Sequence, residues 1–166
     1  MKSLSSLIPL ALLATAAFAQ AEPSDPSAER GRYLVTVAGC NDCHTAGYAQ
    51  QGDVIPEADR LQGVGVGFSG PWGVSYPGNL RLQAATLDEA AWLHRVRAGG
   101  LPPMPWGALQ SMTDTDLRSV YRYLHDLGPA GQPAPVALPP GAPIPTPHFV
   151  FVPQAPTHVG MAPAGR

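Results

Sequence analysis

The segment Cys40-Asn41-Asp42-Cys43-His44 is the most informative part of this sequence. Its C-x-x-C-H pattern is the attachment signature of a covalently bound haem. Two thiols three residues apart can reach the two vinyl groups on one edge of a haem and form thioethers. The histidine that follows then lies beneath the iron, where its imidazole supplies one axial bond. The pattern therefore predicts haem attachment through Cys40 and Cys43, with His44 as the proximal ligand.

Three other chemistries use closely spaced cysteines, and each fits this sequence less well. A thiol redox pair follows a strand and begins a helix whose dipole lowers the thiol pKa, whereas Cys40 follows the end of a helical pattern. A structural zinc site needs four ligands, and the sequence has no second cluster of cysteine and histidine. A plain disulfide between Cys40 and Cys43 leaves His44 without a role. Haem attachment is therefore the preferred interpretation.

A methionine in a stiff loop is the expected second axial ligand. Haem iron in proteins takes Met, His or an external ligand at its sixth position. Met104 lies in Leu101-Pro102-Pro103-Met104-Pro105, where three prolines restrict the backbone and lower the entropic cost of a weak thioether bond. Met112 is explained instead as a hydrophobic staple of the helix that follows it. His94 is the alternative ligand, but its place in a charged helix favours a solvent-facing side chain.

The composition excludes some classes of function. The chain has 166 residues, of which 13% are charged, and a formal net charge of −2. Nucleic-acid binding needs a concentrated basic surface, so this balance argues against it. The presence of only 2 cysteines excludes a scaffold of several disulfides. With 18 glycines and 20 prolines, the chain is expected to form only a modest core of its own.

Residues 1–21 have the character of a secretory signal peptide. Lys2 gives a positive start, residues 7–18 form a short apolar run, and small residues precede the two candidate cleavage positions, after Ala19 or after Ala21. The alternative is an uncleaved anchor, but the run is shorter than the ~20 residues of a membrane span. The chain is therefore predicted to be periplasmic or secreted, with no membrane span after cleavage.

The body of the chain is expected over residues 22–128, and its first helix begins after Ser27 and ends at Gly39. The apolar positions of this helix, at helical spacing, are Tyr33, Leu34, Val37 and Ala38. Residues 45–85 are rich in glycine and proline and predict a long loop. A loop of this length argues against a simple helical bundle, so a bound group is expected to occupy part of the interior.

Two more helices are expected after this loop. Thr86-Leu87-Asp88-Glu89 has the pattern of a capping box and predicts a helix that ends at Gly99. Thr113 is the expected cap of the last helix, which ends at Gly128. The apolar stripe of the last helix consists of Leu117, Val120, Tyr121, Leu124 and Leu127.

Residues 129–166 form a Pro-rich tail. The tail contains eleven prolines and no charged residue before Arg166, a composition that favours extended polyproline conformations over a packed core. Its one apolar run, Phe149-Val150-Phe151-Val152, predicts an extended arm that lies across the body. Disorder of the tail is the alternative.

Several of these motifs together resemble a class I cytochrome c with a single haem. The likeness rests on Gly31-Arg32-Tyr33-Leu34 ahead of the haem motif and Thr45, on Met104-Pro105, and on Thr113-Asp114-Thr115-Asp116-Leu117 with Tyr121-Arg122-Tyr123-Leu124. The stretch Gly70-Pro71-Trp72-Gly73, with Asn79-Leu80, is similar to bacterial periplasmic cytochromes and to cytochrome subunits of dehydrogenases. The match spans residues 28–127.

The resemblance implies an all-α cytochrome c fold, with three to four short helices and long loops wrapped around one covalently attached haem c. It implies that the first and last helices cross near Gly31, which allows their close approach. It also implies axial ligation by His44 and Met104, and one-electron cycling between Fe(III) and Fe(II) by a carrier that is not an enzyme. The implied partners are redox proteins, a donor dehydrogenase and an acceptor oxidase or reductase.

Four further side chains are candidates for lining the haem pocket, with ordinary packing as the alternative for each: Trp72, Tyr76, Arg81 and Trp106. The carbonyl that orients the imidazole of His44 is not identifiable, because Thr45-Ala46-Gly47-Tyr48 stands where small carriers often have a proline.

Two other functions stay open. One is a haem enzyme or sensor with an open sixth position, and the other is a cytochrome subunit of a larger dehydrogenase or oxidase complex, docked through the tail.

Overall fold

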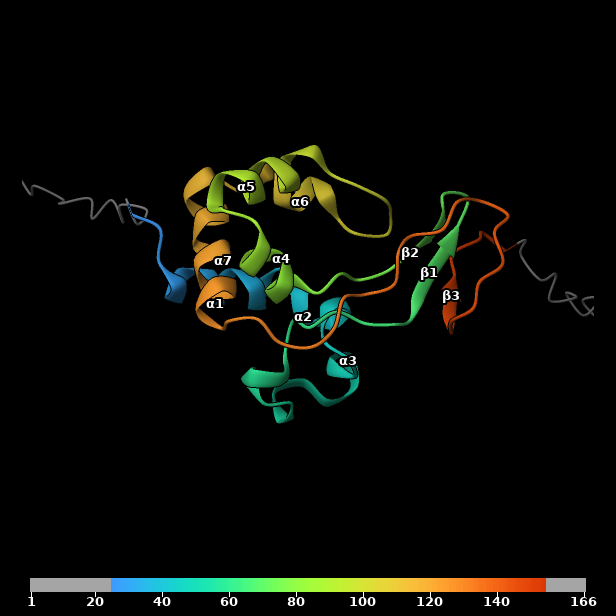
Figure 1. The fold of residues 1–166 in the computed structure, drawn as a ribbon, viewed down its shortest axis with the longest axis horizontal. Helices are drawn as coiled ribbons and strands as arrows, with labels where there is room; N and C mark the ends of the chain where they lie inside the picture. Colours follow the sequence, from blue (N-terminus) through green and yellow to red (C-terminus); the bar gives the residue numbers. More distant parts are fainter. Residues whose placement is uncertain (1–24, 155–166) are drawn as a thin grey trace, which may run out of the picture.

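The computed structural model describes residues 25–154, with a helical body at one end and a small sheet at the other (Figure 1). The helices are α1 (Ala28–Val37), α2 (Cys40–His44), α3 (Tyr48–Gln51), α4 (Leu80–Thr86), α5 (Glu89–Ala98), α6 (Trp106–Ser111) and α7 (Asp114–Asp126), with 3-10 turns at Gly52–Val54 and Glu57–Asp59. The strands are β1 (Gly67–Gly70), β2 (Gly73–Ser75) and β3 (His148–Val150). The predicted signal peptide, residues 1–21, and its cleavage positions at Ala19 and Ala21 lie outside the described residues.

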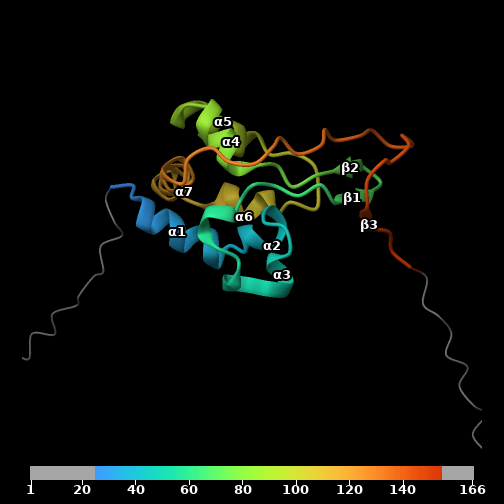
Figure 2. The same ribbon diagram turned by 60° about the horizontal axis from the view of Figure 1, so that its bottom comes forward.

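Helices α1 and α7 cross at Gly31 and together support the core (Figure 2). A Cβ atom on Gly31 would lie 2.0 Å from the carbonyl oxygen of Ser119, so no larger residue fits at the crossing. Ser27 caps α1 by accepting a hydrogen bond from the backbone N–H of Arg30, and its own N–H donates to Ser119 Oγ at 3.1 Å. The predicted cap and the predicted close approach at Gly31 are both confirmed.

The apolar stripe predicted for α7 is confirmed, whereas the stripe predicted for the first helix is wrong at three of its four positions. Leu117 and Leu124 are fully buried on the inner face of α7. On α1 the residues that face α7 are Gly31, Leu34 and Val35, because they share one face with the crossing point. Tyr33 and Val37 lie outside this face, with exposed fractions of 55% and 59%, and Ala38 is exposed as well.

The capping box predicted at Thr86 is also wrong. Thr86 is the last residue of α4, a short helix that lies within the predicted loop, and its hydroxyl donates to the carbonyl of Leu82. The cap of α5 is Asp88, whose Oδ1 accepts from the N–H of Ala91 at 2.8 Å. Aspartate is an equally good cap and places a negative charge at the positive end of the helix dipole.

The mainly helical architecture is confirmed, but the all-α class is not, because the described residues also form a small sheet of order β2-β1-β3. Strands β1 and β2 form an antiparallel hairpin in which Phe68 pairs with Ser75. Strand β3 pairs in parallel with β1, and Phe68 lies opposite Phe149. Together with α3, α4 and the 3-10 turns, β1 and β2 account for much of the segment predicted as a loop over residues 45–85.

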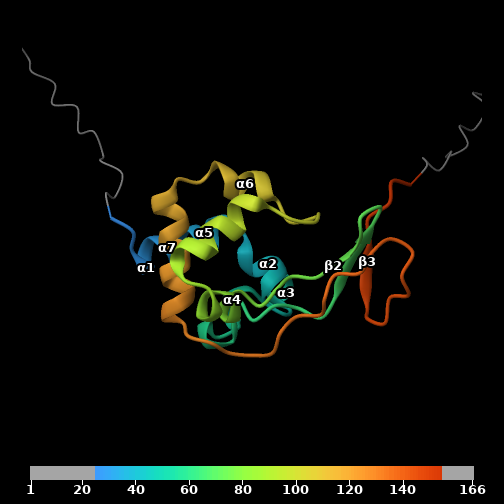
Figure 3. The same cartoon turned by 45° about the horizontal axis from the view of Figure 1, so that its top comes forward.

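The Pro-rich arm, residues 129–154, runs back along the body to the sheet (Figure 3). Leu138 and Val74 exchange two backbone hydrogen bonds of 2.9 Å each. The ring of Phe149 stacks on Phe68 with centroids 5.6 Å apart, and Phe151 contacts Phe68 at the same separation. The extended arm predicted from the apolar run is therefore present in the described part of the tail.

No helix between residues 25 and 154 combines the length and apolar character that crossing a membrane requires.

Candidate cofactor site

A cavity of about 280 Å³ opens between α2, the loop that precedes α6, and the first half of the arm. Apolar side chains supply most of its surface. All four residues predicted to attach or ligate haem are among the residues that line it: Cys40, Cys43, His44 and Met104. Three come from one short helix and the fourth from a loop sixty residues later in the chain. The structure therefore brings the predicted ligand set to one place.

Helix α2 positions the two cysteines. Gly39 takes a left-handed conformation, with φ of 66°. The chain therefore changes direction after α1, and α2 begins at Cys40. Residues three apart on a helix lie on one face, so both thiols are presented together. Both thiols are free, with Cys40 half-buried and Cys43 exposed. Burial raises the pKa of the Cys40 thiol to about 11, and burial followed by the charge of Asp42 raises the pKa of the Cys43 thiol.

His44 is buried and held in one orientation. Its exposed fraction is 7%, and its Nδ1 lies 2.8 Å from the carbonyl oxygen of Gly78. A carbonyl only accepts, so Nδ1 carries the proton and donates, which leaves Nε2 with a free lone pair. Burial lowers the pKa of His44, partly offset by the Gly78 bond, and so favours the neutral imidazole that a metal requires. Gly78 is the orienting carbonyl that could not be identified from the sequence.

The backbone on both sides of His44 is also fixed. The carbonyl of His44 accepts from the N–H of Gly63 at 2.8 Å. The Thr45 hydroxyl donates to Asn41 Oδ1 and accepts from the N–H of Leu61, each at 2.8 Å. These bonds join α2 to the loop beneath it, so the imidazole is attached to a rigid frame.

The loop that carries Met104 is held by three hydrogen bonds. The indole N–H of Trp106 donates to the carbonyl of Leu101 at 3.1 Å, and the backbone N–H of Trp106 donates to the carbonyl of Met104 at 2.8 Å. The Ser75 hydroxyl donates to the carbonyl of Pro102. The loop is thus tied both to α6 and to the end of β2, which keeps the thioether of Met104 at the cavity wall.

The four further candidates divide evenly. Tyr76 and Trp106 line the cavity, whereas Trp72 and Arg81 do not. The indole N–H of Trp72 donates to the carbonyl of Phe68, and its ring packs on Phe151, in the sheet. Arg81 is buried, and its guanidinium donates to the carbonyls of Gly128, Leu127 and Ala58. It closes the end of α7 instead of facing the cavity.

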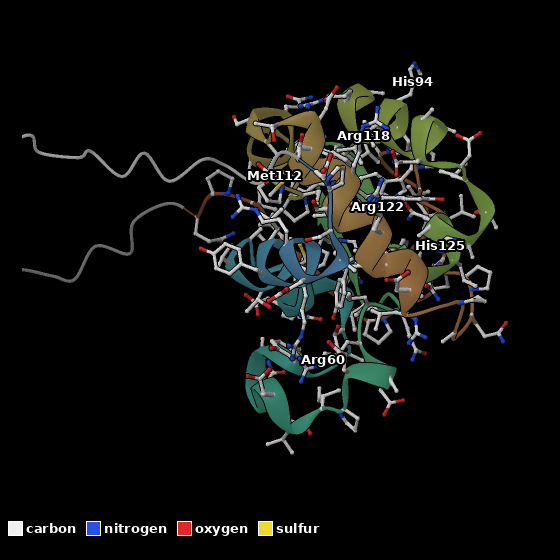
Figure 4. The ribbon with its side chains drawn as sticks, turned by 90° about the vertical axis from the view of Figure 1, so that its left-hand side faces the viewer. Arg60, His94, Met112, Arg118, Arg122 and His125 are labelled. Atoms are coloured by element: carbon white, nitrogen blue, oxygen red, sulfur yellow. The ribbon has the colours of Figure 1, made fainter. Side chains whose placement is uncertain are left out.

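The alternative ligands lie elsewhere. His94 is exposed on α5 and points away from the body (Figure 4). Met112 packs against the core between α6 and α7 and is not part of the cavity wall. Within residues 25–154, no three or more His, Cys, Asp and Glu side chains form a cluster that could hold a metal ion.

Four wall and support residues were not foreseen. Gly78 orients His44, and Asn79 binds the arm, while Pro135 and Ala137 of the arm line the cavity. Gly78 acts through its backbone carbonyl. Pro135 and Ala137 reach the cavity only because the arm folds back from a distant part of the sequence. Neither leaves a pattern in the sequence. For Asn79 the only signal was its place in the stretch similar to periplasmic cytochromes.

Comparisons with known proteins identify relatives of this chain. The chain is 33% identical over 122 residues to the fructose dehydrogenase cytochrome subunit of Gluconobacter japonicus, a match covering 66% of this chain and 23% of that protein. It is 29% identical over 136 residues to the alcohol dehydrogenase (quinone) cytochrome c subunits of Gluconacetobacter polyoxogenes and Komagataeibacter europaeus, covering 74% of this chain and 27% of each relative. The chain thus spans about a quarter of the length of these curated relatives.

These similarities confirm the resemblance seen in the sequence: the chain is a relative of c-type cytochromes, and in particular of dehydrogenase cytochrome subunits. No family model matches the chain. No solved structure matches it either.

Proposed function

We propose that this chain is a one-electron carrier in which haem c is attached through Cys40 and Cys43 and ligated by His44 and Met104. The observation that carries the proposal is the convergence of these four side chains on one mainly apolar cavity, with the imidazole already oriented by Gly78. The residues present fit a haem, since the cavity offers two free thiols, one available imidazole nitrogen and one thioether.

Each residue has a distinct task in this proposal. Cys40 and Cys43 would form thioethers that keep the cofactor on the chain, while His44 and Met104 would bind the iron and so exclude substrates from it. When bound, haem supplies reversible one-electron exchange between Fe(III) and Fe(II). The apolar walls disfavour the extra positive charge of the ferric state, and the soft thioether of Met104 favours the ferrous state. Both effects raise the reduction potential.

The proposed partner is a dehydrogenase. The relatives are named as cytochrome subunits of dehydrogenases, and a chain that fills both axial positions has no open iron position for a substrate. We therefore propose that this chain accepts electrons from a catalytic dehydrogenase subunit and passes them on, without catalysing a reaction itself. Its location in the proposal is the periplasm or the exterior, after removal of residues 1–21.

Intact-mass and visible spectroscopy of the exported chain test the attachment. We expect the mass of a chain starting at Gln20 or Glu22 plus one haem that resists acidic acetone, with a low-spin spectrum and the weak long-wavelength band typical of methionine-ligated ferric haem. A Cys40→Ala, Cys43→Ala double variant should lose the covalent haem. A colourless chain with only its polypeptide mass would overturn the proposal, and a high-spin spectrum would favour an enzyme or sensor with an open sixth position.

The role as a dehydrogenase carrier needs a separate test. The purified chain, with its haem in the ferric state, is mixed with a bacterial membrane fraction. The absorbance of reduced haem is then followed after an alcohol or a sugar is added. We expect reduction that depends on the substrate and on the fraction. Reduction at the same rate without substrate would contradict the dehydrogenase partner while leaving the carrier function intact.

A further inference from the structure

The first half of the Pro-rich arm, residues 129–138, forms part of the cavity wall. Pro135 and Ala137 line the same cavity as His44 and Met104. We infer that this part of the arm, fastened by Asn79, shields the haem from water and so sets its reduction potential. The inference rests on the proposed haem function and assigns to a segment outside the helical body a role in tuning that function.

Asn79 is the first point at which the arm is fastened. Its side chain has an exposed fraction of 3%, and its Nδ2 donates to the carbonyls of Ala130 at 2.7 Å and Gln132 at 3.2 Å. Its Oδ1 accepts from the N–H of Leu82 at 3.0 Å and so caps α4. One buried amide therefore joins the arm to the helix that follows the His44-orienting loop.

A second fastening lies just beyond the cavity. Leu138 and Val74 exchange two backbone hydrogen bonds, which joins the arm to β2. Gly73, next to Val74, has a φ of 96°, and a Cβ atom there would lie 2.1 Å from the carbonyl oxygen of Leu138. Only glycine lets the arm approach β2 this closely. Pro135 and Ala137 therefore lie between two attached positions of the arm, the Asn79 contacts on one side and the Leu138 pairing on the other.

The chemistry of this wall suits a shielding role. Residues 129–138 contain no charged side chain, and three prolines reduce the number of backbone donors. An apolar wall lowers the local dielectric constant and so disfavours the more positively charged ferric iron. When the wall moves away, water reaches the cavity and the ferric state gains stability. The reduction potential then falls, although His44 and Met104 are unchanged.

Asn79→Ser is the first test, made in the haem-loaded full chain. Serine is an effective helix cap and can still accept from Leu82, but its hydroxyl is too short to reach the arm. We expect a fall of about threefold in the ratio of reduced to oxidised protein at a fixed applied potential, which is about 30 mV for one electron. The Leu138 amide should exchange its hydrogen faster. The matched control is Thr113→Ser at the cap of α7, which should change neither measurement.

Gly73→Ala displaces the arm at its second fastening and keeps the inference testable if Asn79→Ser fails to fold. Its control is Gly52→Ala, which also places an alanine at a positive φ, 57°, but with no atom within 4 Å of the new Cβ. We expect the lower potential in Gly73→Ala only, with the low-spin spectrum retained. An unchanged reduction potential in the folded variants overturns the inference, even if the Leu138 amide exchanges its hydrogen faster. Absence of haem from the wild-type chain would instead contradict the proposed function.

Discussion

His44 and Gly78, 34 residues apart in the sequence, are joined by a 2.8 Å hydrogen bond from imidazole Nδ1 to a backbone carbonyl. This bond fixes the tautomer and raises the basicity of the nitrogen that remains available to a metal. Gly63 packs directly against the backbone of Gly78, where a Cβ atom would lie 2.9 Å from the carbonyl carbon, and its N–H donates to the carbonyl of His44. The orientation of the proximal ligand therefore depends on a glycine that does not touch the imidazole.

Gly63→Ala should disturb this arrangement. Gly63 has a φ of 80°, and a Cβ atom would lie 2.7 Å from the nitrogen of Asn79 and 2.9 Å from the carbonyl carbon of Gly78. Strain and overlap together are expected to lower the free energy of unfolding by roughly 2–4 kcal/mol. A weaker bond to His44 should also raise the reduction potential, since a less basic imidazole stabilises ferric iron less.

The matched control for Gly63→Ala is Gly65→Ala, two residues away, where no atom lies within 4 Å of the new Cβ. Denaturant unfolding and redox titration of both haem-loaded variants make the comparison. Equal potentials in the two variants would show that the Gly78 carbonyl does not tune the ligand.

Met104→Ala is expected to convert a six-coordinate low-spin haem into one with an open position. The reduction potential should fall by on the order of 0.1 V, because the thioether that favours ferrous iron is gone. Added cyanide or imidazole should then bind readily. Met112→Ala is the control, since Met112 packs against the core and is not part of the cavity wall. Loss of the long-wavelength ferric band in Met112→Ala instead would reverse the ligand assignment.

Local patterns in the sequence predicted much of the helical framework and pointed to four residues that line one cavity. Caps and spacing are short-range features, so Ser27 and Thr113 were identifiable as helix caps and Cys40, Cys43 and His44 as a unit. The cap of α5 was misplaced by two residues because Thr86 and Asp88 are both good caps, and only the presence of α4 decides between them.

Features that depend on long-range pairing could not be predicted. The sheet requires β1 to pair with a strand from the tail, and no local signal in the glycine-rich segment specifies this partner. The contacts of Arg81 could not be predicted for the same reason. Its guanidinium donates to backbone carbonyls. Every residue has a carbonyl, so the sequence does not indicate which ones Arg81 binds.

Arg81→Lys should therefore lower stability and leave the potential unchanged. The guanidinium binds three carbonyls, including that of Gly128 at 2.6 Å, at the negative end of the α7 dipole. Lysine cannot reproduce this planar set of donors, so a loss of about 2–4 kcal/mol in unfolding free energy is expected. Arg32→Lys, at an exposed ion pair with Glu57, should cost less than about 1 kcal/mol. A large potential shift in Arg81→Lys would favour the original haem-facing interpretation.

Tyr123 is expected to make the free energy of unfolding fall at alkaline pH. Its hydroxyl donates to Glu57 Oε1 at 2.8 Å, and burial together with this carboxylate raises its pKa well above the usual value. Above about pH 10 the unfolded chain releases the phenol proton while the native chain keeps it, so stability falls as pH rises. This contribution is complete below pH 10. Denaturant unfolding from pH 8 to 11 should show a flatter alkaline decline for Tyr123→Phe than for wild type, and Tyr33→Phe, at an exposed ring, should keep the wild-type slope.

Gly31→Ala tests the helix crossing on which the body depends. Alanine ordinarily stabilises a helix relative to glycine by roughly 0.5–1 kcal/mol, and Gly107→Ala in α6, where no atom lies within 4 Å of the new Cβ, should show this gain. At Gly31 the new Cβ would lie 2.0 Å from the carbonyl oxygen of Ser119 and 2.8 Å from Tyr123 Cβ. Because backbone cannot move aside as a flexible side chain can, α1 must separate from α7, and a loss of at least about 3 kcal/mol is expected. Equal stabilisation in both variants would show that the two helices have room to move apart.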